Sequence, residues 1–206
     1  VLCNVSAIRE IYTLSLHDAL PICNACCGSG VGPKAISDVY GIVKAYTTRV
    51  GEGPFPSELF DAVGDAIQQK GVEFGATTGR KRRCGWLDMV ILRNAVRLNG
   101  LTGLVITKLD VLGGLDEIKI CNAYRYGGAA FAEFPTSLKV LAACEPVYEV
   151  LPGWREDISG VRRLEDLPEN ARAYLRRIEA LAETPIKIVS VGPGRNETIV
   201  LENPFR

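Results

Sequence analysis

The sequence predicts an α/β protein with a largely parallel sheet and flanking helices. Hydrophobic residues make up 47% of the 206 residues, which is enough to bury a substantial core. Short apolar runs of strand length alternate with segments whose apolar residues recur at helical spacing. Because strands that alternate with helices usually lie parallel to one another, this order of elements predicts the fold class.

Four helices are predicted from this periodicity. Ser57 is a plausible N-cap for the second of them, and Gly71 a plausible end. The stripe of apolar residues is clearest in the fourth, which Pro185 follows. The predicted ranges are 35–46, 57–70, 86–98 and 167–183.

Five segments predict strands. The apolar run 104–107 is typical of a strand that is buried on both faces. Residues 117–126 partly alternate between apolar and polar, as a strand covered on one side does. The other predicted strands are 146–151, 186–191 and 198–201.

The first 22 residues differ from the rest of the chain in their sequence pattern. The chain opens without Met, and residues 9–22 resemble a translated sequencing adapter fused to a truncated gene. We therefore expect residues 1–22 to be a non-native segment, although as protein they could form a short helix ending at Pro21. Residues 23–206 carry the fold prediction.

Composition argues against several classes of protein. Lys plus Arg and Asp plus Glu both number 24, which argues against a nucleic-acid or membrane-surface binder. The seven Cys, an odd number, occur in apolar contexts and favour a reducing compartment over a disulfide scaffold. No apolar run approaches the roughly 20 residues of a membrane helix. We expect a cytoplasmic protein with no nucleic-acid or membrane partner.

Two apparent motifs fail on inspection. Residues 28–34 look like a phosphate loop, but they lack the Gly-Lys-Ser/Thr order, and Pro33 removes a backbone donor. Cys23 and Cys26 have metal-ligand spacing without a second pair. The only His is His17, within residues 1–22, so no metal site and no His-based catalysis are expected in the rest of the chain.

Residues 77–83 form a basic loop with two Thr hydroxyls, one Gly and four cationic side chains. Hydroxyls and backbone N–H groups at the entrance to a helix can hold anionic oxygens. Arg side chains add two-pronged recognition of carboxylate or phosphate. From composition alone, an anion site and a solvated surface remain equally open. Among the carboxylates, Glu73, Asp88 and Glu133 are candidates that nothing in the sequence separates.

Two further motifs follow apolar runs. The tetrapeptide at 107–110 places Lys108 and Asp110 after a buried strand, and ligands of open α/β sheets bind beyond such strand ends. One ionised carboxylate can accept both N1–H and N2–H₂ of guanine, a donor pair that adenine lacks. The Gly-rich run 190–194 would let backbone groups approach a ring or phosphate. Taken singly, each motif is more often a simple turn.

Together these blocks resemble the adenylosuccinate synthetase family. Order and spacing match from about Gly28 to Phe205. The matching blocks are KAYTTRVGEGPFPSEL at 44–59, EFGATTGR at 73–80, GWLD at 85–88, TKLDVL at 107–112 and LPGW at 151–154.

The resemblance implies a purine-biosynthetic ligase in which IMP, L-aspartate and GTP give adenylosuccinate, GDP and phosphate. GTP phosphorylates the 6-oxygen of IMP, and the aspartate amine then displaces that phosphate. Magnesium as cofactor and a homodimer are also implied. Residues 23–206 would be the C-terminal part of a P-loop-NTPase-like domain, with strands and helices as predicted above.

The resemblance also implies roles for individual residues. Arg80 would contact IMP as well as aspartate, and Val50 would lie beside the IMP ribose. Lys81 stands where the family commonly has Arg, which keeps the charge but loses the forked geometry. The implied substrate-binding residues are Val50, Ala76, Thr77, Thr78, Gly79, Arg80, Lys81 and Arg82. The implied GTP-binding residues are Arg82, Lys108, Leu109, Asp110, Ser190, Val191 and Gly192.

The sequence also departs from the family pattern. The N-terminal phosphate loop, the Asp base, the catalytic His and the Gln that assists it have no counterpart here, so no catalytic residue is assigned. We expect this chain alone to be inactive and to bind GTP poorly. The alternatives are a stand-alone guanine-nucleotide-binding module and a non-functional fragment whose uncovered sheet edges promote aggregation.

Overall fold

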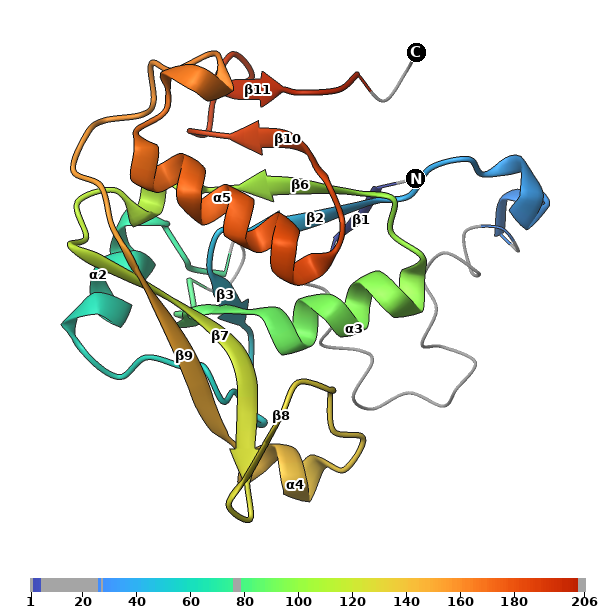
Figure 1. The fold of residues 1–206 in the computed structure, drawn as a ribbon, viewed down its shortest axis with the longest axis vertical. Coiled ribbons are helices and arrows are strands. Elements are labelled where there is room, and N and C mark those ends of the chain that lie inside the picture. Colours follow the sequence, from blue (N-terminus) through green and yellow to red (C-terminus); the bar gives the residue numbers. More distant parts are fainter. Residues whose placement is uncertain (1, 5–25, 27, 76–78, 204–206) are drawn as a thin grey trace.

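A five-stranded sheet forms the centre of the molecule (Figure 1). The computed structural model describes residues 2–4, 26, 28–75 and 79–203. The first four strands of this sheet are parallel, and the fifth is antiparallel to its neighbour. This confirms the predicted largely parallel α/β fold. In spatial order the strands are β1 (Leu2–Asn4), β2 (Tyr40–Lys44), β6 (Gly103–Thr107), β10 (Ile186–Ser190) and β11 (Thr198–Val200).

Two smaller sheets flank the central one. β3 (Thr47–Arg49) pairs antiparallel with β4 (Arg83–Gly85), and together they form a short ribbon. In the other sheet, the long strand β7 pairs antiparallel with β8 and β9 and parallel with β5. Its strands are β5 (Leu87–Asp88), β7 (Glu117–Tyr126), β8 (Ala129–Phe131) and β9 (Glu145–Pro152).

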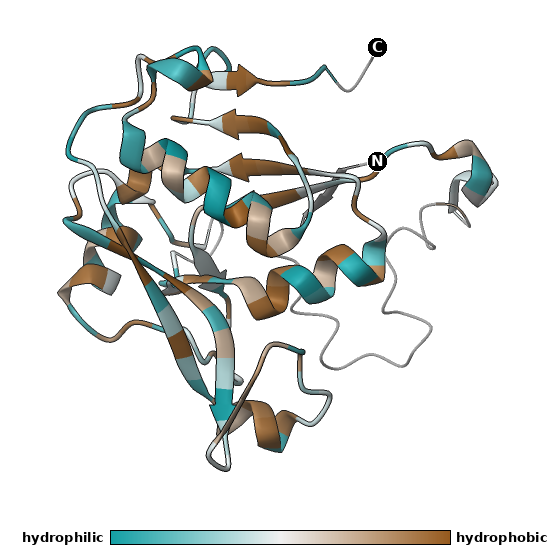
Figure 2. Cartoon of the chain, viewed as in Figure 1, coloured by the Kyte–Doolittle hydropathy of each residue, from teal (hydrophilic) through white to brown (hydrophobic). Residues whose placement is uncertain are grey.

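Helices cover the central sheet, and α5 crosses its face in Figure 1. The buried side of α5 includes Tyr174, whose hydroxyl donates to the Ala45 carbonyl oxygen at 2.6 Å and so ties the helix to the end of β2. Figure 2 shows hydrophobic residues along β6 and alternating character along α5, as burial of one helix face requires. The α-helices are α2 (Ala62–Lys70), α3 (Met89–Asn99), α4 (Leu138–Ala142) and α5 (Glu169–Ala182). The 3-10 helices are η2 (Pro33–Ala35), η3 (Leu109–Leu112) and η4 (Leu164–Asp166).

The helix predicted over 35–46 is wrong. That segment contains the end of η2 and the whole of β2. Burial along β2 does not alternate, because side chains on both of its faces are buried or half-buried, so its sequence lacks the period of two that marks a half-exposed strand. Val39, Tyr40, Ile42 and Val43 are β-branched or aromatic residues that suit a strand.

The second and third helices begin later than predicted. Asp61 Oδ1 accepts from the backbone N–H groups of Val63 and Gly64 at 3.1 and 3.0 Å, so Asp61 is the N-cap of α2, whereas Ser57 is buried upstream. Asp88 caps α3 in the same way. Gly71 ends α2 as predicted, and Gly100, with φ of 58°, ends α3.

The other predicted elements are confirmed with shifts of a few residues. α5 lies within the predicted 167–183, and the five predicted strands correspond to β6, β7, β9, β10 and β11. Within residues 1–22, the structure describes only β1, at the edge of the central sheet. The suggested helix ending at Pro21 lies outside the described residues, and the non-native origin of this segment stays a prediction.

Val72 gives a first testable prediction. It has a φ of 50°, a left-handed conformation that strains a β-branched residue, and its side chain is 71% exposed. Asn tolerates this conformation better. We expect Val72→Asn to raise the free energy of unfolding by about 1 kcal/mol in urea denaturation. Val150→Asn, at a similarly exposed Val in β9, is the control and should not stabilise. A Val72→Asn variant no more stable than the parent would contradict the strain.

Candidate functional site

The carboxyl ends of three neighbouring parallel strands bring the predicted motifs to one edge of the central sheet. β2 ends at Lys44, β6 at Thr107 and β10 at Ser190. Ile106 of β6 is paired with Val189 of β10, so the segments that follow these two strands begin side by side. This is the edge at which open α/β sheets bind ligands.

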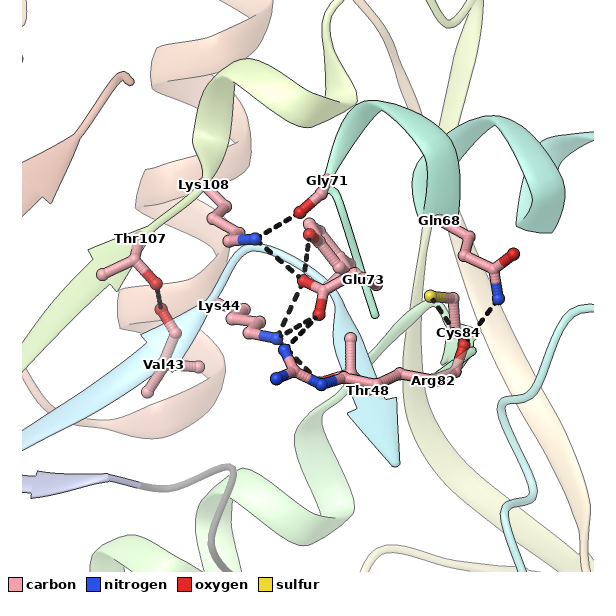
Figure 3. Close-up of polar contacts among 11 residues, drawn as sticks. Val43, Lys44, Thr48, Gln68, Gly71, Glu73, Arg82, Cys84, Thr107 and Lys108 are labelled. Atoms are coloured by element: carbon pink, nitrogen blue, oxygen red, sulfur yellow. Dashed lines mark hydrogen bonds and ion pairs between the residues drawn. The ribbon is translucent and has the colours of Figure 1, made fainter. Parts of the chain in front are cut away.

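A buried carboxylate, Glu73, lies beside the ends of β2 and β6 (Figure 3). Tyr46 Oη donates to its Oε1 at 2.6 Å, and Lys44 Nζ donates to both oxygens at 2.8 Å. Arg82 Nη1 donates to Oε2 at 2.9 Å, and Lys108 Nζ to Oε1 at 3.1 Å. We call these five residues the Glu73 cluster.

Charge in the Glu73 cluster is concentrated around one ionised carboxylate. Burial alone would raise the pKa of Glu73, but hydrogen bonds from Lys44, Tyr46 and Arg82 outweigh it and lower that pKa to about 2. The carboxylate is therefore ionised at neutral pH. Burial raises the pKa of the Tyr46 hydroxyl, so it remains a donor. Three cations face one carboxylate, and the cluster therefore carries excess positive charge toward the strand ends.

The basic loop is closed at its base by backbone hydrogen bonds. The amide of Gly75 donates to the Arg80 carbonyl oxygen at 2.8 Å. The amide of Arg82 donates to the backbone carbonyl oxygen of Glu73 at 2.9 Å. Arg80 and Lys81 are exposed, whereas the Arg82 side chain turns toward Glu73. Gly79 has a φ of 63°, which favours glycine. The predicted residues Ala76, Thr77 and Thr78 lie outside the described residues.

Arg83, the last cation of the basic run, points elsewhere. Its guanidinium forms an ion pair with Glu58 and lies 5.5 Å from the Phe55 ring centroid. Its Nη1 also donates to the Gly53 carbonyl oxygen at 2.8 Å. Arg83 therefore fastens the 51–58 segment to β4 and is not directed at the Glu73 cluster. Val50, half-exposed, follows β3, whose Arg49 is paired with Arg83, so Val50 lies close to the base of the loop.

Residues 108–110, which we call the guanine-reading segment after their predicted role, turn sharply after β6. Lys108 has a φ of 59°, and its ammonium donates to the Gly71 carbonyl oxygen as well as to Glu73. Leu109 is fully buried and anchors η3. Burial raises the pKa of Asp110, with a smaller contribution from the negative charge of Glu197. Glu197 lies in the segment after β10, and that segment begins beside η3 because Val189 is paired with Ile106.

The segment after β10 is folded tightly against Glu197. Ser190 Oγ donates to the Gly192 carbonyl oxygen at 2.8 Å, and the buried Val191 donates its amide to the Glu197 carbonyl oxygen at 2.9 Å. A β-carbon at Gly192 would lie 2.6 Å from a Glu197 carboxylate oxygen, so the Glu197 side chain packs closely against this glycine. The structure thus brings 190–192 beside 108–110, while the role of each residue toward a nucleotide stays a prediction.

Sequence reasoning missed Lys44, Tyr46 and the importance of Glu73. The helix wrongly predicted over 35–46 hid the fact that Lys44 ends a buried strand, just as Thr107 ends β6. Lys44 and Glu73 are 29 residues apart, so no local spacing reveals their contact.

Of the other two candidate carboxylates, Glu133 is exposed, and Asp88 is buried in a structural role. Asp88 Oδ1 accepts from the amides of Val90 and Ile91 at 3.0 and 3.2 Å. Its Oδ2 accepts from the Tyr124 hydroxyl at 2.6 Å. This carboxylate therefore joins the start of α3 to β7.

Over 2–4, 26, 28–75 and 79–203, no three His, Cys, Asp or Glu side chains gather closely enough to hold a metal ion. None of the helices in these ranges is long and apolar enough to cross a membrane.

Comparison with known proteins gives consistent matches. A family model described as adenylosuccinate synthetase matches residues 16–199. Adenylosuccinate synthetases from Desulfatibacillum aliphaticivorans and Desulfosudis oleivorans are 68% and 66% identical over 88% of the chain. The chain spans 42% of the length of these two relatives. A solved structure of fully ligated adenylosuccinate synthetase from Plasmodium falciparum has a TM-score of 0.84 at 42% identity, over 87% of this chain and 43% of that one.

Proposed function

Because the chain belongs to the adenylosuccinate synthetase family, we propose that it supplies the guanine-binding and aspartate-binding part of an enzyme that joins IMP to L-aspartate with GTP. The observation that carries this proposal is the convergence of 108–110, 190–192 and the base of the basic loop at one sheet edge. Each motif alone is ambiguous, but three at one strand edge are not expected of unrelated turns.

In this proposal, Asp110 selects guanine. Its ionised carboxylate accepts from N1–H and N2–H₂ of the base, and adenine would leave that carboxylate without donors. The base pocket lies between Lys108 and Leu109 on one side and Ser190, Val191 and Gly192 on the other, and the buried side chains of Leu109 and Val191 support these two segments from the core. Arg82 reaches GTP from the base of the loop, where it is 30% exposed beside the buried Glu73.

The basic loop holds L-aspartate. Ala76 and the basic loop as far as Arg82 provide hydroxyls, backbone N–H groups and cations, which suit a substrate with two carboxylates. Arg80 and Val50 also contact IMP. The γ-phosphoryl group of GTP passes to the 6-oxygen of IMP, and the amine of aspartate then displaces phosphate at C6 and loses a proton. None of the described residues is assigned to proton transfer in this reaction. The homodimer, the magnesium requirement and the cytoplasmic location that the family resemblance implies stay predictions.

Base selectivity of the 206-residue chain tests this proposal. In a titration monitored by ¹⁵N amide spectra, GMP should shift the signals of 108–110 and 190–192, whereas AMP at equal concentration should not. Weak binding is expected, and micromolar GTP affinity would instead favour the stand-alone guanine-nucleotide module. Equal shifts with GMP and AMP, or shifts confined to other segments, would contradict the proposed base pocket.

A further inference from the structure

Glu73 is shared between two parts of the proposed site. One carboxylate oxygen, Oε2, accepts from Arg82 at the base of the basic loop, and the other, Oε1, accepts from Lys108 at the start of the guanine-reading segment. Lys44 donates to both oxygens at 2.8 Å and so fixes the plane of the carboxylate. Figure 3 shows Arg82 and Lys108 approaching Glu73 from different chain segments.

The burial pattern places Glu73 behind these cations. The side chain of Glu73 is 0% exposed, whereas those of Arg82 and Lys108 are 30% and 36% exposed. The cations can therefore meet a ligand and the carboxylate cannot. Because Arg82 and Lys108 compete for one negative charge, a ligand that draws Arg82 outward strengthens the interaction of Glu73 with Lys108.

Backbone strain is concentrated beside this carboxylate. Among the described residues, Val72, Lys108 and Glu183 are the non-glycine residues with positive φ. Val72 immediately precedes Glu73, and Lys108 contacts it. A β-carbon at Gly71 would collide with the Tyr46 hydroxyl that donates to Glu73. Strained residues persist where the surrounding contacts impose them, and here both lie at the Glu73 cluster.

From this geometry, and resting on the proposed function, we infer that Glu73 is a positioning residue that couples the basic loop to the guanine-reading segment. It touches neither substrate. Occupation of the loop by the carboxylates of aspartate shifts Arg82 away from Glu73, and the released charge holds Lys108, and with it Asp110, in the orientation that reads guanine. Aspartate and the guanine nucleotide therefore bind with positive cooperativity.

The neighbouring Glu58 provides a matched control. It forms an ion pair with Arg83, from the same basic run, and its side chain is 9% exposed. Glu58 contacts neither Arg82 nor Lys108 in the hydrogen bonds of the described residues. If Glu73 only stabilised the fold, Glu58→Gln and Glu73→Gln would leave ligand cooperativity equally intact. If Glu73 couples the two segments, only Glu73→Gln abolishes cooperativity.

A ligand-free measurement on the 206-residue chain tests the connection itself. Arg82→Met should shift the ¹⁵N amide signals of 108–110, and Lys108→Met should shift the Arg82 Nε signal. Arg83→Met, the control, should leave 108–110 unchanged. In a Glu73→Gln background, the effect of Arg82→Met on 108–110 should vanish. If Glu73→Gln does not fold, the comparison of Arg82→Met with Arg83→Met still shows whether the change at Arg82 reaches residues 108–110. Amide signals of 108–110 that do not shift in Arg82→Met would overturn the inference.

Titration of the same chain tests the cooperativity. Saturating L-aspartate should tighten GMP binding about fivefold in the parent chain and in Glu58→Gln, and leave it unchanged in Glu73→Gln. Independent binding in the parent, or cooperativity that survives Glu73→Gln, would overturn the inference. If the ligand-free shifts appear as expected but neither GMP nor aspartate binds, the proposed function fails while the connection through Glu73 stands.

Discussion

Asp110→Asn is expected to weaken guanine-nucleotide binding about 100-fold, because an amide replaces one acceptor oxygen by a donor that faces the donors of the base. Loss of a hydrogen bond to a charged group costs about 3 kcal/mol, which corresponds to this factor. The measurement is kcat/KM for GTP in a hybrid enzyme. In this hybrid, residues 23–206 replace the matching part of the synthetase from D. aliphaticivorans, which is 68% identical.

The chemistry of the base supplies a rescue for this variant. Xanthine carries a carbonyl where guanine carries the 2-amino group, so the side-chain amide that the substitution introduces would donate to it. Asp110→Asn should therefore raise activity with XTP while lowering it with GTP. Asp116→Asn is the control, because Asp116 is a 73% exposed carboxylate in a surface ion pair with Arg155. Unchanged selectivity in Asp110→Asn would remove Asp110 from the base pocket.

Asp88→Ala is expected to lower the free energy of unfolding by about 3 kcal/mol. The change removes the N-cap of α3 and leaves the buried Tyr124 hydroxyl without its acceptor. Asp61→Ala is the matched control, since Asp61 caps α2 at an exposed position and its loss should cost only about 1 kcal/mol. Urea denaturation of both variants measures the difference. Equal losses would show that burial of Asp88 and its bond to Tyr124 contribute nothing.

The same carboxyl should make stability depend on pH. Burial raises the pKa of Asp88 to about 6, from a usual value of 3.8. Between these values the folded chain binds more protons than the unfolded one, so stability falls as pH rises, by about 3 kcal/mol in all. Glu73 acts oppositely at lower pH: its pKa of about 2 means that its contribution is lost as pH falls below about 4.5. Asp88→Asn should abolish the fall between pH 4 and 6, and a persisting fall would assign it to another group.

The elements that could be predicted are those whose signal is local. β6 is a short apolar run buried on both faces, and α5 has one apolar stripe, so both were found from spacing alone. β2 was not predicted because its side chains are buried or half-buried on both faces of the sheet, so apolar and polar residues do not alternate along it. The start of α2 was misplaced because Ser57 and Asp61 are both good caps, and only packing buries Ser57.

The candidate site was predictable only in part. Lys108 and Asp110 follow β6, Ser190 ends β10, and a strand end is visible in the sequence. The Glu73 cluster was not, because Glu73 meets Lys44 and Lys108 across 29 and 35 residues. Such contacts depend on the order of strands in the sheet. Glu73 differs from Glu133 in being buried, and burial cannot be read from the composition.

Formation of adenylosuccinate by the hybrid enzyme tests the central claim most directly. With IMP, L-aspartate and magnesium, we expect the hybrid to form adenylosuccinate with GTP but not with ATP, whereas the 206-residue chain alone forms none. A hybrid that is folded, as judged by cooperative urea unfolding, yet makes no adenylosuccinate would contradict the claim that residues 23–206 supply the guanine-binding and aspartate-binding part of the enzyme. Activity of the chain alone would contradict the expectation that it lacks catalytic residues.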